Sequence, residues 1–357
     1  MSGWLQLPYT DDLFESFRAR YGYELRERLA DLLTDSEGAR RTRCHYWRWV
    51  AERFGEAFGG QVRAWCDSHS VVLTGHCLWE EPLLGHMIFS GDLWEALRHF
   101  TIPGIDMLRN ADGFQGSYRF EDPRGSWHQD RRGNHLTCKV VHAVARHSGG
   151  HEMMSEAYGI CDWGMNLFRQ KCGFNYQVAL GVTLFNDNSL ITSIADFRKW
   201  AIAGKHFTQP WWPYYKHYAD YNARLAAVHA EGEPVASVAV LFPRSAIWAK
   251  YGPNPPLESL QTQLYELLDE LIRRQWHFDF IHEIRQSELV DLWGQNIFCH
   301  QGDIRILASI RYGFFKGDFV KTHAFLALSG HLLVGNGFMT EKIERNLIQI
   351  MEPLRRI

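Results

Sequence analysis

Glu80 and Glu81 follow an apolar segment of the chain, at a place where two carboxyl groups can do acid–base chemistry. Glu80 lies four residues after His76, which ends the run Val71-Val72-Leu73-Thr74-Gly75-His76. Two adjacent carboxylates raise one another's pKa, because like charges at short range disfavour joint ionisation. A carboxyl group held protonated in this way can act as a general acid. Neighbouring carboxylates are also common on surfaces and in ion pairs with arginine, so this pair alone does not identify a catalytic site.

Glu156 and Asp106 end two further apolar segments. Glu156 follows Met153-Met154 and is expected to be buried or nearly so. A buried glutamate must be paired, hydrogen-bonded or functional, and a structural ion pair and a catalytic role are equally open. Asp106 ends the run Ile102-Pro103-Gly104-Ile105-Asp106. It is a weaker candidate of the same kind, because Gly104 can simply mark a turn.

Aromatic residues gather near these carboxylates. The segment Gln209-Pro210-Trp211-Trp212-Pro213-Tyr214-Tyr215 holds four aromatic side chains between and beside two prolines, and Trp163 follows Glu156 closely. Such a loop can stack on the apolar C–H face of a sugar ring. The alternative is an aromatic lid over core helices, and the sequence slightly favours it.

The sequence does not define a metal site. His76 and Glu80 have i, i+4 spacing, but a zinc site there would need a helix and a third ligand, whereas the apolar run before His76 predicts a strand. The seven cysteines form no C-x-x-C pair, so neither a zinc site nor a disulfide framework is indicated. The metal ligands are left unassigned.

The elements that carry these residues alternate between strand and helix. Each predicted strand is short and apolar and releases polar residues at its C-terminal end, which is typical of a parallel sheet or barrel. The predicted strands are 71–76, 102–106, 151–156 and 182–186; the predicted helices are 11–33, 42–68, 93–100, 136–147 and one beginning near 164. Residues 110–134 read as a long loop. Four strands are half of the eight that a closed (β/α)8 barrel needs.

A boundary is predicted near Glu231-Gly232-Glu233-Pro234, which gives two domains, 1–232 and 233–357. The second contains an apolar strand at 235–241, an amphipathic helix at 257–274, and further strands at 278–281, 304–307 and 332–335. This alternation predicts a doubly wound α/β domain. No G-x-G-x-x-G follows its first strand, so a dinucleotide site is not indicated.

Composition narrows the function classes. The chain has 357 residues and a net charge of −3, so it lacks the basic excess that drives binding to nucleic acid. Its N-terminal residues do not resemble a signal peptide, and no apolar stretch is long enough to span a membrane. We therefore expect a cytoplasmic protein with neither a nucleic acid nor a membrane as its partner. The aromatic excess, with 14 Trp among it, is the one unusual feature.

Five motifs together resemble the bacterial α-L-rhamnosidases of glycoside hydrolase family 106. They occur in the family's order over roughly residues 10 to 245: Tyr21-Gly22-Tyr23-Glu24-Leu25; Leu73-Thr74-Gly75-His76 with Glu80-Glu81; Ile102-Pro103-Gly104-Ile105-Asp106; Ser155-Glu156-Ala157-Tyr158-Gly159 with Trp163-Gly164; and Gln209-Pro210-Trp211-Trp212-Pro213-Tyr214-Tyr215. The resemblance implies a TIM-type (β/α) barrel followed by a flavodoxin- or amidotransferase-like α/β domain. Family members are usually far longer, so this chain resembles the C-terminal half of the barrel with the domain that follows it.

The resemblance also implies glycoside hydrolysis by two carboxylates with inversion, assisted by calcium. It makes Glu156 one catalytic candidate and Glu80 or Glu81 the other, with the acid and base roles unassigned. His76, Asp106, Trp163 and Asn186 are carried over as substrate-binding candidates together with Trp211 and Trp212. One departure is that the family's asparagine-proline-histidine appears here as Asn186-Asp187-Asn188.

The leading hypothesis is a hydrolase of α-L-rhamnosides or related glycosides, with a carbohydrate as its partner. A catalytically inactive remnant, or a carbohydrate-binding or assembly subunit, is the alternative from a different class. A retaining β-glycosidase with the same layout is a third reading. A homo-oligomer or a complementing chain would supply the strands that half a barrel lacks.

Overall fold

The chain forms two compact units in a computed structural model. One unit contains Met1–Arg48 and Pro234–Ile357, and the other contains Trp49–Glu233. The structure describes residues 7–36, 38–107, 121–122, 125–126, 131–159, 161, 163–188, 190, 205–232, 234, 236, 238–252, 255, 257–281 and 308–310. The predicted domains 1–232 and 233–357 stay a prediction.

A curled half-barrel of four parallel strands forms the centre of the unit Trp49–Glu233. The strands are β1 (Thr74–Gly75), β2 (Ile102–Met107), β5 (Met154–Ala157) and β6 (Leu184–Asp187), in the order β1-β2-β5-β6. The prediction of a partial barrel is confirmed at this level. Because the strands are parallel and successive, their carboxyl ends lie at one edge of the sheet, where chemistry collects in barrels.

The strand register aligns the polar residues at that edge. Asp106 of β2 is paired with Glu156 of β5, and Glu156 is paired in turn with Asn186 of β6. Residues in register on neighbouring parallel strands point to the same face of the sheet. The carboxyl groups of Asp106 and Glu156 are therefore placed side by side by the backbone alone.

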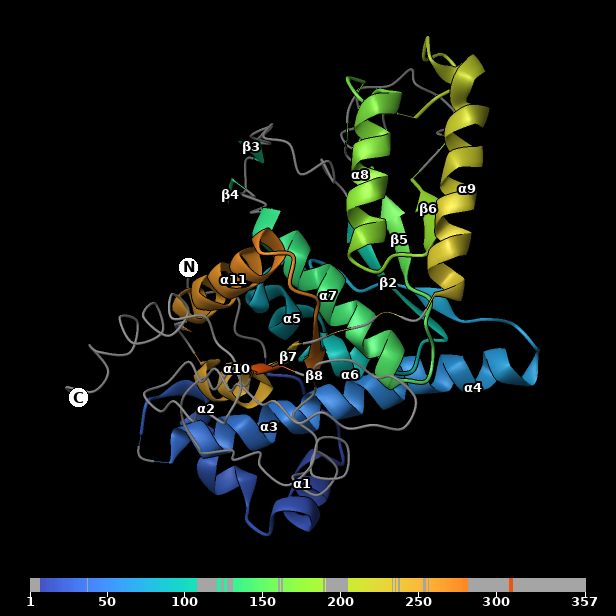
Figure 1. The fold of residues 1–357 in the computed structure, drawn as a ribbon. Coiled ribbons are helices and arrows are strands. Elements are labelled where there is room, and N and C mark those ends of the chain that lie inside the picture. Colours follow the sequence, from blue (N-terminus) through green and yellow to red (C-terminus); the bar gives the residue numbers. More distant parts are fainter. Residues whose placement is uncertain are drawn as a thin grey trace, which may run out of the picture. The chain divides into compact units, whose positions relative to one another are not determined.

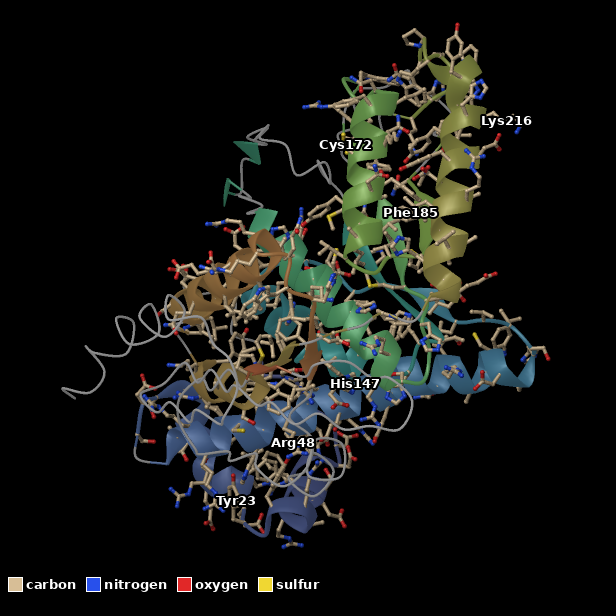
Figure 2. All side chains as sticks on the ribbon, viewed as in Figure 1. Tyr23, Arg48, His147, Cys172, Phe185 and Lys216 are labelled. Atoms are coloured by element: carbon tan, nitrogen blue, oxygen red, sulfur yellow. The ribbon has the colours of Figure 1, made fainter. Side chains whose placement is uncertain are left out.

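The same unit also contains helices. They are α4 (Gln61–Ser68), α5 (Leu83–Ser90), α6 (Leu93–Leu97), α7 (Arg131–His147), α8 (Leu167–Ala179) and α9 (Tyr215–Glu231). Helix α7 packs on β2, and α8 and α9 run side by side (Figure 1). Phe174, Val178 and Tyr218 form a core between these two helices. Phe185 of β6 reaches between them, with its ring centroid 4.3 Å from that of Phe174 (Figure 2).

Strand β1 is shorter than the sequence predicts. Residues 71–76 were expected to form a buried strand, but only Thr74–Gly75 is a strand, and Val71 and Val72 are 50% and 56% exposed. The apolar run is real, yet β1 lies at the edge of the described sheet, where it has one neighbouring strand. An edge position leaves these two valines without a second strand beside them.

The other unit combines N-terminal helices with a smaller sheet. The helices are α1 (Leu13–Tyr21), η1 (Leu25–Arg28), α2 (Leu29–Leu33), α3 (Ala39–Phe54), α10 (Arg244–Lys250) and α11 (Leu257–Arg273), and the last turns of α3 belong to the unit Trp49–Glu233. Strand β7 (Val238–Leu241) pairs in parallel with β8 (Phe278–Ile281) and antiparallel with β9 (Ala308–Ile310). The flavodoxin-like domain stays a prediction, and the expected strands at 304–307 and 332–335 lie outside the described residues.

The structure describes part of the predicted loop, and its helices can be checked for membrane spans. Residues 110–134 were read as a loop; of these, short strands β3 (Glu121–Asp122) and β4 (Gly125–Ser126) form an antiparallel pair, and α7 already begins at Arg131. Among the described residues, none of the helices has both the length and the apolar character needed to cross a bilayer.

A π-helical turn joins α3 to α4. The predicted helix 42–68 is formed by α3, the turn η2 (Gly55–Gly60) and α4 in succession. A Cβ atom on Gly55 would lie 2.5 Å from the backbone oxygen of Glu95 in α6, whereas one on Gly60 would lie 3.6 Å from its nearest neighbour outside the helix backbone, in His99. Glycine at 55 therefore permits the close approach of η2 and α6.

Replacing Gly55 with alanine should destabilise the protein by about 1–3 kcal/mol, because the new methyl group clashes with backbone and not with a movable side chain. The matched control is Gly60→Ala, which should be neutral or stabilising by up to about 1 kcal/mol, since alanine favours the helix and meets no close contact there. Urea unfolding of the two variants measures both effects. Equal stability of the two variants would contradict the proposed close approach.

Candidate functional site

His76 lies between two glutamates at the carboxyl end of β1. Its Nε2 is 2.8 Å from Oε2 of Glu156, and its Nδ1 is 3.2 Å from Oε1 of Glu80 and also contacts the backbone oxygen of Cys77. Both ring nitrogens therefore face acceptors. An imidazole can satisfy acceptors on both sides only when both nitrogens carry a proton, which is the charged form.

The backbone of Glu80 is fixed from several directions. Its carbonyl oxygen accepts hydrogen bonds from Nε2 of His86 at 2.6 Å and from the hydroxyl of Thr137 at 3.0 Å. Trp79, the preceding residue, has a positive φ of 58°. A Cβ on Gly85 would lie 2.0 Å from the Trp79 oxygen, so glycine is required where this loop folds onto α5. Backbone strain of this kind persists where the surroundings hold it in place.

Glu156 is held at the end of β5. One carboxylate oxygen pairs with His76 and the other accepts a hydrogen bond from the side-chain amide of Asn188. The Glu156 side chain is 26% exposed, in contrast to the Glu80 side chain at 0%. Glu156 is thus the glutamate of this pair that solvent or a ligand can reach.

Asp106 completes the cluster. Its backbone N–H donates to Oε2 of Glu80 at 3.1 Å, and its residue is 9% exposed. Its Oδ1 is buried and has no hydrogen-bond partner among the described residues. Burial, together with repulsion from Glu80, raises the pKa of Asp106 to about 8 against the opposing effect of His76. The Asp106 carboxyl group is therefore protonated at neutral pH.

The imidazole of His76 is the counter-charge of the cluster. Burial by itself would lower its pKa, but the hydrogen bond and charge of Glu80, followed by the hydrogen bond of Glu156, outweigh burial and raise the pKa of His76 to about 10. At neutral pH the site thus contains a protonated His76 between Glu80 and Glu156, with a largely protonated Asp106 beside them.

Glu81 and Asn186, two further predicted site residues, differ in how they relate to this cluster. Glu81 is 7% exposed, and its charge contributes to the raised pKa of Asp106. Asn186 pairs in backbone register with Glu156 but is exposed, and the amide that contacts Glu156 belongs to Asn188. The sequence departure at Asn186-Asp187-Asn188 marked the right segment without identifying the contacting residue.

The predicted aromatic residues belong to a packed cluster. The indole N–H of Trp211 donates to the Met165 oxygen at 3.0 Å, and Trp212 stacks on Tyr215 with ring centroids 5.1 Å apart. Trp163 is 40% exposed, and its ring is edge-on to that of His206. The two tryptophans of the loop are partly buried, so part of their area serves packing, as the aromatic-lid reading expects.

A buried lysine anchors this aromatic segment, and sequence reasoning missed it. Lys205 is 4% exposed and pairs with Oδ2 of Asp187 at the end of β6, which also accepts a hydrogen bond from the Tyr215 hydroxyl at 2.6 Å. The Lys205 ammonium lies 4.8 to 5.2 Å from the ring centroids of Tyr158, Tyr215 and Tyr218. Burial lowers the pKa of Lys205, opposed by Asp187. A lone lysine with no motif around it gives no sequence signal for this role.

One set of side chains in the described part of the chain has metal-ligand spacing. Single ligand atoms of His76, Asp106 and Glu156 all lie within 4.8 Å of one another. Calcium prefers six to eight oxygen ligands. The set offers oxygens from two carboxyl groups, but its third member is an imidazole that the glutamates keep protonated. In this arrangement the protonated imidazole supplies the positive charge that a metal ion would otherwise supply. The set therefore does not fit calcium.

Comparisons with known proteins support a fold likeness. No family model matches the sequence, and no curated protein matches it. Among solved structures, a rhamnosidase from Novosphingobium sp. PP1Y matches with a TM-score of 0.51 and 18% identity, over 77% of this chain and 24% of the rhamnosidase chain. This chain therefore spans about a quarter of the length of that rhamnosidase. At this identity the likeness concerns the fold alone.

His76 should titrate near pH 10 in the folded protein, against 6.5 for an unperturbed histidine, as measured by NMR of labelled histidine side chains. Because the folded-state pKa is raised, the stabilisation is fully present below about pH 6.5 and is lost as the pH rises through about 10. Glu156→Gln should lower the pKa of His76, whereas Glu152→Gln, at an exposed neighbouring position, should leave it unchanged. A His76 pKa near 6.5 in the wild type would contradict the described cluster.

Proposed function

We propose that this chain belongs to a glycoside hydrolase that acts on α-L-rhamnosides or related glycosides through two carboxyl groups. The observation that carries the proposal is the convergence of Glu80, Asp106 and Glu156 around His76, at the carboxyl edge of a parallel half-barrel. Glycoside hydrolysis needs one protonated and one ionised carboxyl group at the scissile bond. The fold likeness to a rhamnosidase supports the choice of substrate class.

Glu156 is our candidate for the ionised carboxylate. It is the partly exposed glutamate of the cluster, and His76 and Asn188 orient both of its oxygens. In this role it would activate a water molecule or attack the sugar directly. The fully buried Glu80 is better suited to holding the cluster together, although Glu80 or Glu81 remains the partner in the inverting hypothesis.

Asp106 is a second candidate for the proton donor. Its raised pKa keeps it protonated at neutral pH, as a general acid requires. Its oxygen lies within 4.8 Å of an oxygen of Glu156. Retaining glycosidases keep their carboxyl groups about 5–5.5 Å apart and inverting ones about 6.5–9.5 Å apart. The Asp106–Glu156 spacing is nearer to the retaining range than to the inverting one, which makes a retaining reaction the second candidate function.

The substrate would lie beside the partly exposed Glu156 carboxylate. Trp163 exposes 40% of its surface and could stack on a sugar ring, and Trp211 and Trp212 would support that wall. Calcium dependence is implied by the family resemblance, and we keep it as a proposal. The described donor set does not fit that ion, so no step of the reaction is assigned to it.

A binding or assembly subunit remains the alternative function. The described sheet has four strands, and this chain corresponds to about a quarter of the rhamnosidase it resembles. In this alternative, a second copy or a complementing chain would add strands to the described half-barrel. Such a subunit would keep the aromatic residues and bind a carbohydrate without hydrolysing it.

The test is hydrolysis of aryl glycosides, rhamnosides first, with and without calcium. Glu156→Gln should reduce turnover by about 10²–10⁴-fold, because the amide cannot act as base or nucleophile. Glu152→Gln is the matched control and should retain full activity. An active Glu156→Gln variant would refute the assignment, and sugar binding without turnover in the wild type would favour the subunit reading.

The configuration of the released sugar, followed by NMR, separates the two carboxyl pairs. The family resemblance implies inversion by Glu156 with Glu80 or Glu81, whereas Asp106 as the partner of Glu156 would give retention. Retention would also be the signature of the retaining β-glycosidase alternative if β-glycosides are the substrates cleaved.

A further inference from the structure

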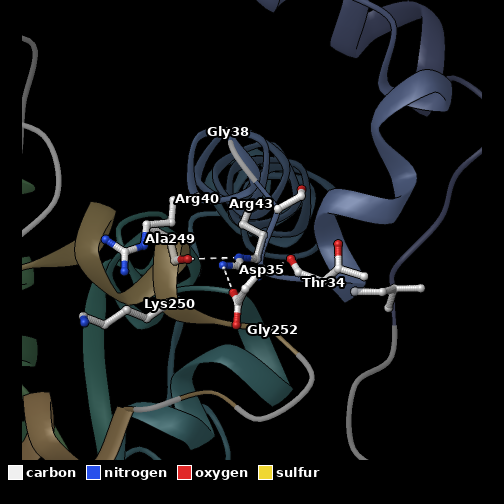
Figure 3. Close-up of a pocket in the computed structure, with 10 residues that line it drawn as sticks. Thr34, Asp35, Gly38, Arg40, Arg43, Ala249, Lys250 and Gly252 are labelled. Atoms are coloured by element: carbon white, nitrogen blue, oxygen red, sulfur yellow. Dashed lines mark hydrogen bonds and ion pairs between the residues drawn. The ribbon is translucent and has the colours of Figure 1, made fainter.

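A cavity lined by polar and apolar groups alike lies in the unit formed by Met1–Arg48 and Pro234–Ile357, which does not contain the carboxylate cluster. It has a volume of about 560 Å³ and is formed by two segments distant in sequence, the α2–α3 region and the end of α10 (Figure 3). Its lining residues are Leu33, Thr34, Asp35, Ser36, Gly38, Arg40, Arg43, Ala249, Lys250 and Gly252. Pockets of about 300–1,000 Å³ hold small molecules.

Arg43 is a buried, hydrogen-bonded part of the cavity lining. Its side chain is 4% exposed. Its guanidinium donates to the Ala249 oxygen at 3.0 Å, to the Thr34 oxygen at 3.1 Å and to the Asp35 carboxylate at 2.8 Å. Because these acceptors come from both segments, Arg43 joins the two sides of the cavity. Three of its five N–H groups are used in these bonds, which leaves donor capacity on the guanidinium.

The fit between the two segments is tight at Gly252. A Cβ on this residue would lie 2.9 Å from Nη1 of Arg43, closer than a Cβ atom normally approaches another heavy atom. Glycine at this position therefore lets the chain after α10 pass directly against the guanidinium. Three hydrogen-bond acceptors thus fix the position of the Arg43 side chain in the cavity wall.

The described part of the cavity lining carries a net positive charge. Among its described lining residues, Arg40, Arg43 and Lys250 carry positive charge and Asp35 alone carries negative charge. Asp35 is already bound to Arg43, and its side chain is 91% exposed. Arg40 and Lys250 extend toward the same side of the pocket, from α3 and α10 respectively (Figure 3). Two like charges on the same side of one cavity favour an anion beside them.

We propose that this cavity binds a small molecule through a phosphate monoester group. The described lining has an excess of two positive charges, which matches the charge of about −1.5 to −2 that such a group carries near neutral pH. Arginine supplies paired donors to phosphate oxygens, and lysine supplies a mobile charge. The cavity is also larger than a phosphate group alone needs, which leaves room for a polar body such as a sugar. The site is separate from the proposed hydrolase site and does not depend on it.

Isothermal titration calorimetry of the full chain tests this proposal with inorganic phosphate, glucose 6-phosphate and glucose. We expect glucose 6-phosphate to bind more tightly than inorganic phosphate and glucose not to bind in the cavity. The double variant Arg40→Ala/Lys250→Ala should weaken glucose 6-phosphate binding at least tenfold. Neither side chain is buried, so the variant should fold, which circular dichroism checks.

Arg41→Ala is the matched control, since Arg41 is an exposed arginine next to Arg40 but does not line the cavity. It should bind glucose 6-phosphate as the wild type does. Glu156→Gln should also bind normally, which separates this site from the hydrolase site. The proposal is overturned if neither phosphate compound binds, if glucose binds as well as its phosphate, or if the double variant loses no more affinity than Arg41→Ala.

Discussion

The candidate site depends on one interaction, the ion pairing of the His76 imidazolium with Glu80 and Glu156. Three carboxyl groups are gathered where water is largely excluded, and each would repel the others if all were ionised. The imidazolium compensates Glu80 on one side and Glu156 on the other. The raised pKa of Asp106 keeps its carboxyl group largely protonated at neutral pH, which lowers the negative charge of the cluster. Buried charges that are paired in this way are tolerated, whereas unpaired ones are not.

The fold provides this arrangement through register and through local strain. Register between β2 and β5 places Asp106 beside Glu156. The positive φ of Trp79 directs the chain so that Glu80 turns back toward His76, and the positive φ of Tyr158 ends β5 just after Glu156. The strained residues thus flank the charged ones. Hydrogen bonds to the Glu80 carbonyl hold the loop after Trp79, and the Tyr158 N–H donates to the Met107 oxygen at 3.0 Å. The charged cluster around His76 and the strained backbone at Trp79 and Tyr158 therefore support each other.

The sequence predicts the parts of this site that depend on local pattern. Short apolar runs followed by polar residues identified β2, β5 and β6 and brought Asp106 and Glu156 forward as candidates, and the run at 71–76 did the same for Glu80. It could not identify Asn188 or Lys205, because their roles depend on where a loop returns to the sheet. The sequence also predicted that Val71 and Val72 are buried, whereas both are exposed. An apolar pair has the same sequence pattern at the edge of a sheet as in its centre. The cationic cavity at Arg43 joins segments about 200 residues apart, and no local pattern reports such a contact.

A double-mutant cycle between His76 and Glu156 tests the central interaction most directly. The free energy of unfolding would be measured in urea at pH 7 for the wild type, His76→Gln, Glu156→Gln and the double variant. If the imidazolium pairs with Glu156 as described, the two substitutions should be non-additive by about 1–3 kcal/mol, and this coupling should disappear above pH 10 as the imidazolium loses its proton. Additivity within about 0.5 kcal/mol at pH 7 would contradict the account.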